Sequence, residues 1–533
     1  MQTRFRKLSI MMFLALASCS FSNGVFAFPH RSSAKDSTSY YVDATSGNDA
    51  DSGTAPLKAW KTLANVNATT FRPGDAILLK AGSVWDGQLW PKGSGEEGRP
   101  IRLGKYGDGA KPLIQANGKF EDAVLLKNQE QWELEDLEVT NKGTTNATRR
   151  GVHLALEDFG DAHHLVVRRM TIHDVNGRDG AKDNGGITFT VDGERKPSRF
   201  VDLLIEDNTL HHVDRNGISS WSDRWERAKW YPSLGVAVRG NRLEDIGGDG
   251  IMIAVTDGAV IERNVVGKAN QRSEGYNIAI WTWSADNSII QYNEAWGTKG
   301  ERDGEGFDSD WNSRNTLIQY NYSHDNEGGF LLICNEGGHD PSESVGNVGT
   351  TVRYNISQND RNRGIALAGP VKDTAIYNNT IYVGVGTRSD AVLFTDWDGW
   401  PQNTGVFNNI FYAAGESRIG HAVARSKTNG HHTSAVGFGE SRETRFEANV
   451  YFGEIEKVDD PQALTANPEF MAAPQAPVER ERLRGFALKN TSKARGSGQP
   501  LPENGGKDFF GAPLAACTKP DRGAVQSGRC DTR

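Results

Sequence analysis

The stretch Ile290-Gln291-Tyr292-Asn293 returns 28 residues later as Ile318-Gln319-Tyr320-Asn321, and this recurrence decides the fold. Each copy has an apolar residue, two further residues and an asparagine. Other copies end at Asn208, Asn241, Asn264, Asn355, Asn379 and Asn409. The successive spacings are 33, 23, 29, 28, 34, 24 and 30 residues. Short strands that repeat with a drifting period, without helical patterns between them, predict a solenoid.

A second recurring strand begins with glycine and lies between copies of the first. Examples are Gly250-Ile251-Met252-Ile253-Ala254, Gly306-Phe307-Asp308-Ser309-Asp310 and Gly329-Phe330-Leu331-Leu332-Ile333. Each coil therefore holds at least two short strands, separated by Gly, Asn and Asp turns. Stacked coils of this kind predict an all-β fold, the right-handed parallel β-helix. The recurring asparagine is expected to bond the turn backbone of the next coil, which is a structural role.

Motifs at both ends of the chain support this prediction. The N-terminal part contains Tyr40-Tyr41-Val42-Asp43 and Trp60-Lys61-Thr62-Leu63, and the C-terminal part contains Asp508-Phe509-Phe510-Gly511. With these motifs the sequence resembles the secreted bacterial right-handed β-helix proteins, which are largely carbohydrate-active enzymes. The resemblance implies a glycoside hydrolase or a polysaccharide lyase and does not indicate the sugar.

The chain is expected to have four parts. Residues 1–27 form a targeting segment, 38–130 an N-terminal cap with the first coils, 131–455 the central β-helix with its groove, and 456–533 a C-terminal extension. The first part has a basic start (Arg4, Arg6 and Lys7) followed by an apolar run too short to span a membrane. Cleavage after Ala27 or lipobox processing at Cys19 are both open, and either predicts export to the periplasm or beyond.

The composition narrows the class of ligand. The 533 residues include 60 glycines and 13 tryptophans, and the net charge is −8, so no basic surface for nucleic acid is indicated. We expect a monomer that acts on a polysaccharide or oligosaccharide. Cys517 and Cys530 are expected to form a disulfide in an oxidising compartment, and Cys334 to be a small buried apolar residue.

The stretch Asp303-Gly304-Glu305-Gly306-Phe307-Asp308-Ser309-Asp310-Trp311 places four carboxylates within eight residues of a predicted strand. Because side chains alternate across a strand, Phe307 and Ser309 are expected to face the core, with Asp308 and Asp310 facing outward. Alignment of the glycine-led strands predicts Leu331 and Ile333 as the outward neighbours of the two aspartates on the next coil.

This acidic stretch is the predicted catalytic centre. Asp308 or Asp310 is assigned as nucleophile or base, with Glu336 as general acid and Glu327 as another candidate partner. Residues two apart on a strand are separated by about 6.6 Å, and stacked strands by about 4.8 Å. The aspartate pair would thus fit the lower limit for inversion, and a pair across coils would fit retention, so both mechanisms stay open.

Residues near this stretch in the sequence are candidates for binding the sugar. Aromatic faces stack on sugar rings, and charged groups bind hydroxyls or balance the carboxylates. The candidates are Trp281, Trp283, Lys299, Arg302, Glu305, Trp311, His339, Asp396 and Trp397.

Two further functions stay open at this stage. A Ca²⁺-dependent lyase acting on a uronate-containing glycan would use Lys299, Arg302, Arg361 or Arg363 as base and Asp303, Glu305 and Asp308 as calcium ligands. A hydrolase would need no cofactor. A non-catalytic glycan-binding protein is the third class, against which the clustered carboxylates argue.

Overall fold

The computed structural model describes residues 37–533 except 181, 301, 424–434, 515–518 and 528–533. The described chain is almost entirely β-structure, in strands labelled β1 (Ser39–Val42) to β41 (Val450–Glu456). Its helices are η1 (Pro56–Lys58), α1 (Leu63–Ala68), η2 (Arg227–Lys229) and η3 (Arg480–Phe486). None of these helices has the length or apolar character needed to cross a membrane. The 1–27 segment with Cys19 and the Cys517–Cys530 pair lie outside the described residues.

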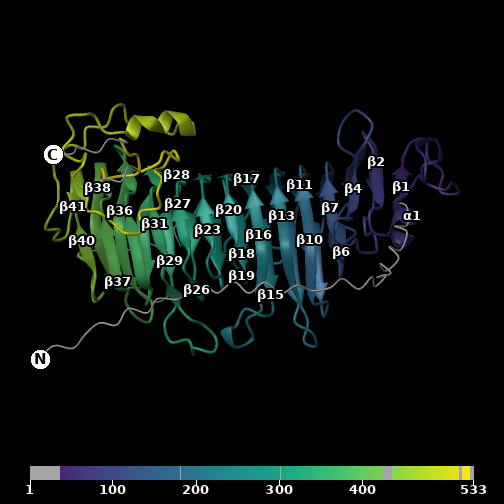
Figure 1. Cartoon of the computed structure of the whole chain (residues 1–533), viewed down its shortest axis with the longest axis horizontal. Helices are drawn as coiled ribbons and strands as arrows, with labels where there is room; N and C mark the ends of the chain where they lie inside the picture. The colour runs from purple at the N-terminus through teal and green to yellow at the C-terminus, as the bar shows by residue number, and fades with distance from the viewer. Residues whose placement is uncertain (1–36, 181, 301, 424–434, 515–518, 528–533) are drawn as a thin grey trace, which may run out of the picture. The chain divides into compact units, whose positions relative to one another are not determined.

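The strands form two large sheets, in which consecutive coils stack side by side (Figure 1). In the described part of the chain, one sheet has 17 strands and the other has 24. The named ladders are parallel, apart from the pairing of β38 (Ile410–Val423) with β39 (Ala435–Val436). The predicted parallel β-helix is therefore confirmed.

Each central coil has three strand-bearing faces. The first face contains β16 (Ser233–Arg239), β20 (Val260–Glu262), β23 (Ile289–Gln291), β27 (Leu317–Gln319), β31 (Thr351–Arg353) and β34 (Lys372–Tyr377). The second contains β17 (Arg242–Ile246), β21 (Val265–Gly267), β24 (Glu294–Trp296), β28 (Tyr322–His324), β32 (Ile356–Gln358) and β35 (Thr380–Val383). The third, which carries the acidic stretch, contains β15 (Asn216–Ser222), β18 (Ile251–Ala254), β22 (Ile280–Trp283), β25 (Glu305–Ser309), β29 (Gly329–Cys334), β33 (Asn362–Ala368) and β36 (Arg388–Asp396).

The interior is built from rows of apolar side chains that stack from coil to coil. One row on the third face is fully buried and consists of Ile251, Ile280, Phe307, Leu331, Ile365 and Val392. Burial of aliphatic and aromatic side chains in such rows stabilises each coil against its neighbours. The position of Phe307 in this row confirms that this parity of the strand faces the core.

The recurring asparagines form a continuous buried ladder at the turn between the first and second faces. The Oδ1 of each asparagine accepts hydrogen bonds from the backbone N–H and the Nδ2 of the asparagine one coil earlier, as between Asn293 and Asn264 (2.9 and 3.0 Å). The ladder runs from Asn208 to Asn449 and ends at Asp460, whose carboxylate accepts from Asn449. The predicted structural role of the asparagines is confirmed, but each side chain bonds the backbone of the preceding coil rather than that of the next.

The chain after β41 packs against the second face. Phe470, Phe486 and Phe509 of this segment form a buried cluster with Tyr322 and Tyr382 of β28 and β35. The third face, which carries the acidic stretch, takes no part in this cluster.

Replacement of one ladder asparagine should measurably destabilise the β-helix. In Asn293→Ala, the backbone N–H and Nδ2 of Asn264 lose their buried acceptor, and the Ile261 carbonyl loses its donor. We expect the free energy of unfolding to fall by about 2–4 kcal/mol, measured by urea denaturation. Asn146→Ala, at an exposed position, is the matched control. Equal stability of the two variants would contradict the structural role.

Candidate active site

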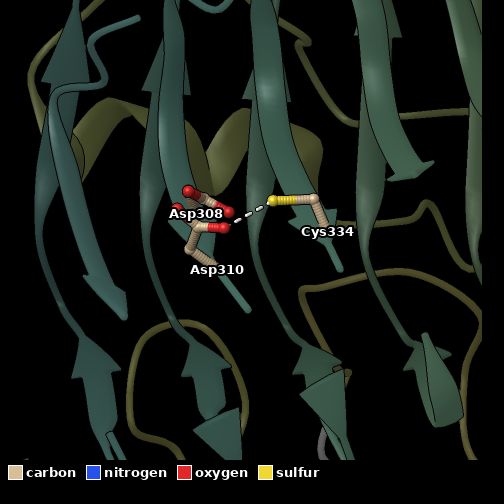
Figure 2. A group of neighbouring side chains, drawn as sticks. All are labelled: Asp308, Asp310 and Cys334. Atoms are coloured by element: carbon tan, nitrogen blue, oxygen red, sulfur yellow. Dashed lines mark hydrogen bonds between the residues drawn. The ribbon is translucent and has the colours of Figure 1, made fainter. Parts of the chain in front are cut away.

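Asp308 and Asp310 lie on the outer surface of β25 and at its end. Phe307 belongs to the core, and the Ser309 hydroxyl lies 3.2 Å from that of Thr350 inside the coil. Asp308 is 1% exposed, whereas Asp310 is partly exposed. Figure 2 shows the two carboxyl groups pointing toward the neighbouring strand. The predicted alternation is therefore present at these four residues.

The neighbours of the two aspartates differ from those expected. In the observed register Asp308 lies between Trp281 of β22 and Leu332 of β29. Leu331 and Ile333, predicted to face outward, belong to the core, so that prediction was wrong by one residue. The reason is that Gly329 lies opposite Glu305 and not opposite Gly306. The two glycines that begin these strands in the sequence are not equivalent in space.

This register brings Cys334 to Asp310. The Cys334 Sγ donates to Asp310 Oδ1 at 2.8 Å, and the Trp311 backbone N–H donates to the same oxygen at 2.7 Å. One carboxylate oxygen of Asp308, one of Asp310 and the Cys334 sulfur all lie within 4.8 Å of one another (Figure 2). Cys334 is buried as expected, but it faces the carboxylates rather than the core.

Burial and mutual repulsion raise the pKa values of both aspartates. The pKa of Asp308 lies well above its ordinary value because the group is desolvated and because Asp310, Asp303 and Glu305 are nearby. Desolvation also raises the pKa of Asp310, and its hydrogen bonds from Cys334 and Trp311 partly offset this rise. Two carboxyl groups this close do not ionise independently, so the two aspartates titrate as a coupled pair.

Glu305 forms an ion pair with Arg363 past the glycine that lies between them. In the register, Gly329 separates Glu305 from Arg363, and the guanidinium of Arg363 approaches Glu305 Oε1 to 2.7 Å. Gly329 has a φ of 143°, and a Cβ there would overlap the Arg363 carbonyl oxygen, so the position requires glycine. Burial raises the pKa of Glu305, and the charge of Arg363 lowers it in part.

The carboxyl group of Asp303 also has a strongly raised pKa. It precedes β25 and remains partly exposed. Its pKa is raised to about 8, first by desolvation and then by the charge of Glu305, with Asp310 adding to the rise and Arg363 opposing it. A carboxyl group with this pKa carries its proton at neutral pH.

Two charged residues beside the cluster could not be found from local sequence signals. Asp249, which is fully buried, accepts from the Trp281 indole N–H (2.9 Å) and pairs with Lys182 (2.9 Å). The Lys182 ammonium also lies 4.5 Å from the centre of a Trp281 ring. Lys182 comes from the segment before β12 (Gly185–Asp192), far from the acidic stretch in sequence. Its position depends entirely on the stacking of coils.

Aromatic side chains form a connected group beside the carboxylates. Trp221 contacts Trp283, which contacts Trp311, which in turn stacks on His339. The ring centres of these three pairs are 5.4, 5.8 and 4.9 Å apart, respectively. Trp225, from the loop after β15, contacts both Trp283 and Trp311. Trp281, Trp283, Trp311 and His339 were predicted, whereas Trp221 and Trp225 were not. Trp221 is 43% exposed and therefore offers a ring face to a ligand.

Of the remaining predicted residues, Glu336 contacts this aromatic group through His339. Glu336 is half-exposed on the turn after β29, with its carboxylate 3.6 Å from His339 Nε2. Glu327 is exposed and accepts the Gly300 N–H. Lys299 and Arg302 are exposed, and Arg302 lies over the Tyr276 ring. Asp396 accepts the Gly399 N–H, and the carbonyl of Trp397 accepts the Gly337 N–H, so this loop contacts the Glu336 turn.

Among the described residues, the suggested calcium ligands Asp303, Glu305 and Asp308 do not form one group of converging ligand atoms. Glu305 pairs with Arg363, which also donates to the carbonyls of Arg302 and Asp303. The convergent ligand atoms in the described part of the chain belong instead to Asp308, Asp310 and Cys334.

The comparisons with known proteins agree with this architecture. Residues 122–381 match the family described as "Right handed beta helix region". The sequence is 26% identical over 612 aligned residues to lacto-N-biosidase of Bifidobacterium longum subsp. longum, covering 92% of this chain and 36% of that protein. The chain thus spans about a third of this curated relative.

Solved structures of a GH136 lacto-N-biosidase from Eubacterium ramulus are also similar. The native protein superposes with a TM-score of 0.55 at 26% identity, covering 67% of this chain and 65% of that chain. Its selenomethionine derivative gives a TM-score of 0.58 at 24% identity, covering 79% and 68%.

Loss of Arg363 should destabilise the protein unless Glu305 is neutralised as well. Arg363→Met leaves a buried carboxylate without its cation, which we expect to lower the free energy of unfolding by about 3–5 kcal/mol. Glu305→Gln combined with Arg363→Met should recover a large part of this loss. Arg302→Met, at an exposed position, serves as the control. Additive effects of the two substitutions in urea denaturation would refute the pairing.

Proposed function

We propose that this protein is a glycoside hydrolase that acts on an oligosaccharide, with a reaction of the lacto-N-biosidase type. The observation that carries the proposal is the group of buried, mutually interacting carboxyls beside an aromatic surface on one face of the β-helix. Glycosidic cleavage requires one carboxyl group that donates a proton and another that acts as nucleophile or base. The similarity to the two lacto-N-biosidases supports the same class of substrate.

In this proposal Asp303 is the general acid. With a pKa of about 8 it is protonated at neutral pH, and its partial exposure allows contact with a leaving group. We prefer Asp303 to Glu336, the acid expected from the sequence, because Glu336 is half-exposed on the turn after β29, beside His339. Asp303 donates its proton to the glycosidic oxygen as the bond to the departing sugar breaks.

Asp310 is the nucleophile or base. It is partly exposed, and two donors (the Cys334 thiol and the Trp311 N–H) stabilise its negative charge. Asp308 beneath it is buried, and desolvation together with the neighbouring carboxyls raises its pKa. The exposed ring of Trp221, supported from below by the buried Trp283, and the partly exposed Trp311 provide aromatic surface on which a sugar ring can stack.

The proposed place of action is outside the cytoplasm. The basic start and short apolar run of the first 27 residues support export, with cleavage after Ala27 or processing at Cys19 as the two routes. We further propose that the exported protein acts as a monomer without a required cofactor.

The roles of the carboxyls can be separated by the leaving group. Asp310→Asn should lower kcat by at least about 10²–10⁴-fold on all substrates. Asp303→Asn should have an effect of that size on a natural oligosaccharide and a much smaller one on a nitrophenyl lacto-N-bioside, whose leaving group needs no proton. Glu336→Gln is the matched control. A larger loss in Glu336→Gln than in Asp303→Asn would return the acid role to Glu336.

The alkaline side of the pH profile should report on Asp303. Because the acid must be protonated, kcat/KM should fall as the pH rises above about 8. Glu305→Gln removes the neighbouring charge that raises the pKa of Asp303 most, so the alkaline limb should move to lower pH. An unmoved limb in this variant would show that another group titrates.

A further inference from the structure

The Asp308–Asp310–Cys334 group (Figure 2) has the ligands of a transition-metal site. A sulfur and two carboxylate oxygens from adjacent strands lie within 4.8 Å of one another. Cys334 is a free, buried cysteine, 3% exposed. The register holds these residues on neighbouring strands of the β-helix, so the arrangement does not depend on a loop.

An unpartnered oxygen points to a missing ligand. Asp308 Oδ1 is buried without any hydrogen-bond partner in the described structure, and the residue is 1% exposed. Buried polar atoms are nearly always satisfied, so an orphan of this kind calls for an explanation. The carboxylate oxygen of Asp308 lies beside Asp310 and Cys334, where a cation would satisfy it and reduce the repulsion between the aspartates.

The positive charges nearby are engaged elsewhere. Lys182 donates to Asp249 and to the Tyr276 carbonyl, and Arg363 pairs with Glu305. Lys182 lowers the pKa values of Asp308 and Asp310 only in part, so a bound cation would add charge compensation to both.

We propose that Asp308, Asp310 and Cys334 bind a thiophilic divalent cation of the Zn²⁺ or Cd²⁺ class. Zn²⁺ takes thiolate and carboxylate ligands in a four-coordinate site, and three protein ligands leave one position for water. Ca²⁺ and Mg²⁺ require six or more oxygen ligands and do not suit a thiol. On binding, Cys334 gives up its thiol proton to solvent, any proton on the ligating oxygens of Asp308 and Asp310 is released as well, and the metal takes the place of these protons.

The consequence for activity rests on the proposed function. Asp310 cannot attack a sugar while it coordinates a metal, so occupancy inhibits hydrolysis, and a chelator restores it. The metal is an inhibitor at this site and takes no part in the reaction.

The test measures metal binding without relying on catalysis. Full-length protein is titrated with Cd²⁺ while the ultraviolet charge-transfer band of a Cd–thiolate bond is recorded, and Zn²⁺ binding is measured by competition with a chromogenic chelator. We expect one site per chain with this band. Cys334→Ser, which keeps a donor for Asp310, should lose the band, and Asp308→Asn should weaken Zn²⁺ binding at least tenfold.

Controls distinguish this thiol from the others in the chain. The double variant Cys517→Ser/Cys530→Ser should keep the band, and Mg²⁺ or Ca²⁺ should not displace Cd²⁺. An undiminished band in Cys334→Ser, with normal circular dichroism, would overturn the proposal. Because the band needs no catalysis, an inactive wild-type protein would refute the hydrolase proposal and leave the metal test intact.

Discussion

The register between coils is the constraint on which the rest of the structure depends. It is held by a buried line of asparagines in which each side-chain oxygen satisfies two donors of the preceding coil. An amide is suited to this because it both donates and accepts, so the chain of bonds continues until a carboxylate, Asp460, ends it. With the register fixed, the neighbours of every outward side chain are fixed too.

The electrostatics of the candidate site follow from carboxyl groups that are removed from water. Four carboxyls lie in one short stretch, and Arg363 and Lys182 compensate only part of their charge. Burial therefore keeps some of the carboxyls protonated, while hydrogen bonds from Cys334 and Trp311 favour ionisation of Asp310. Different environments give similar side chains different roles, which is the arrangement that acid–base cleavage needs.

The outward placement of the two aspartates was predicted correctly from the sequence, and their neighbours were not. Alternation along one strand placed Asp308 and Asp310 outward, because the side-chain period of a strand is local. Their partners depend on where the next strand begins. Since Gly329 lies opposite Glu305, Cys334 and Leu332 became the neighbours in place of Ile333 and Leu331. Lys182 and Trp225 come from segments that no local sequence pattern places beside the acidic stretch.

The sequence by itself determined the parallel β-helix, the role of the asparagine repeat and the strand that carries the carboxylates, because each follows from periodic patterns within short segments. Only the tertiary structure decided which groups face those carboxylates: Cys334 on Asp310, Arg363 on Glu305, and a rim of tryptophans. The physical reason is that the sequence of one strand decides which of its side chains share a face, but not which residue of the next coil lies opposite each of them. The choice is made by packing and hydrogen bonding summed over the whole stack.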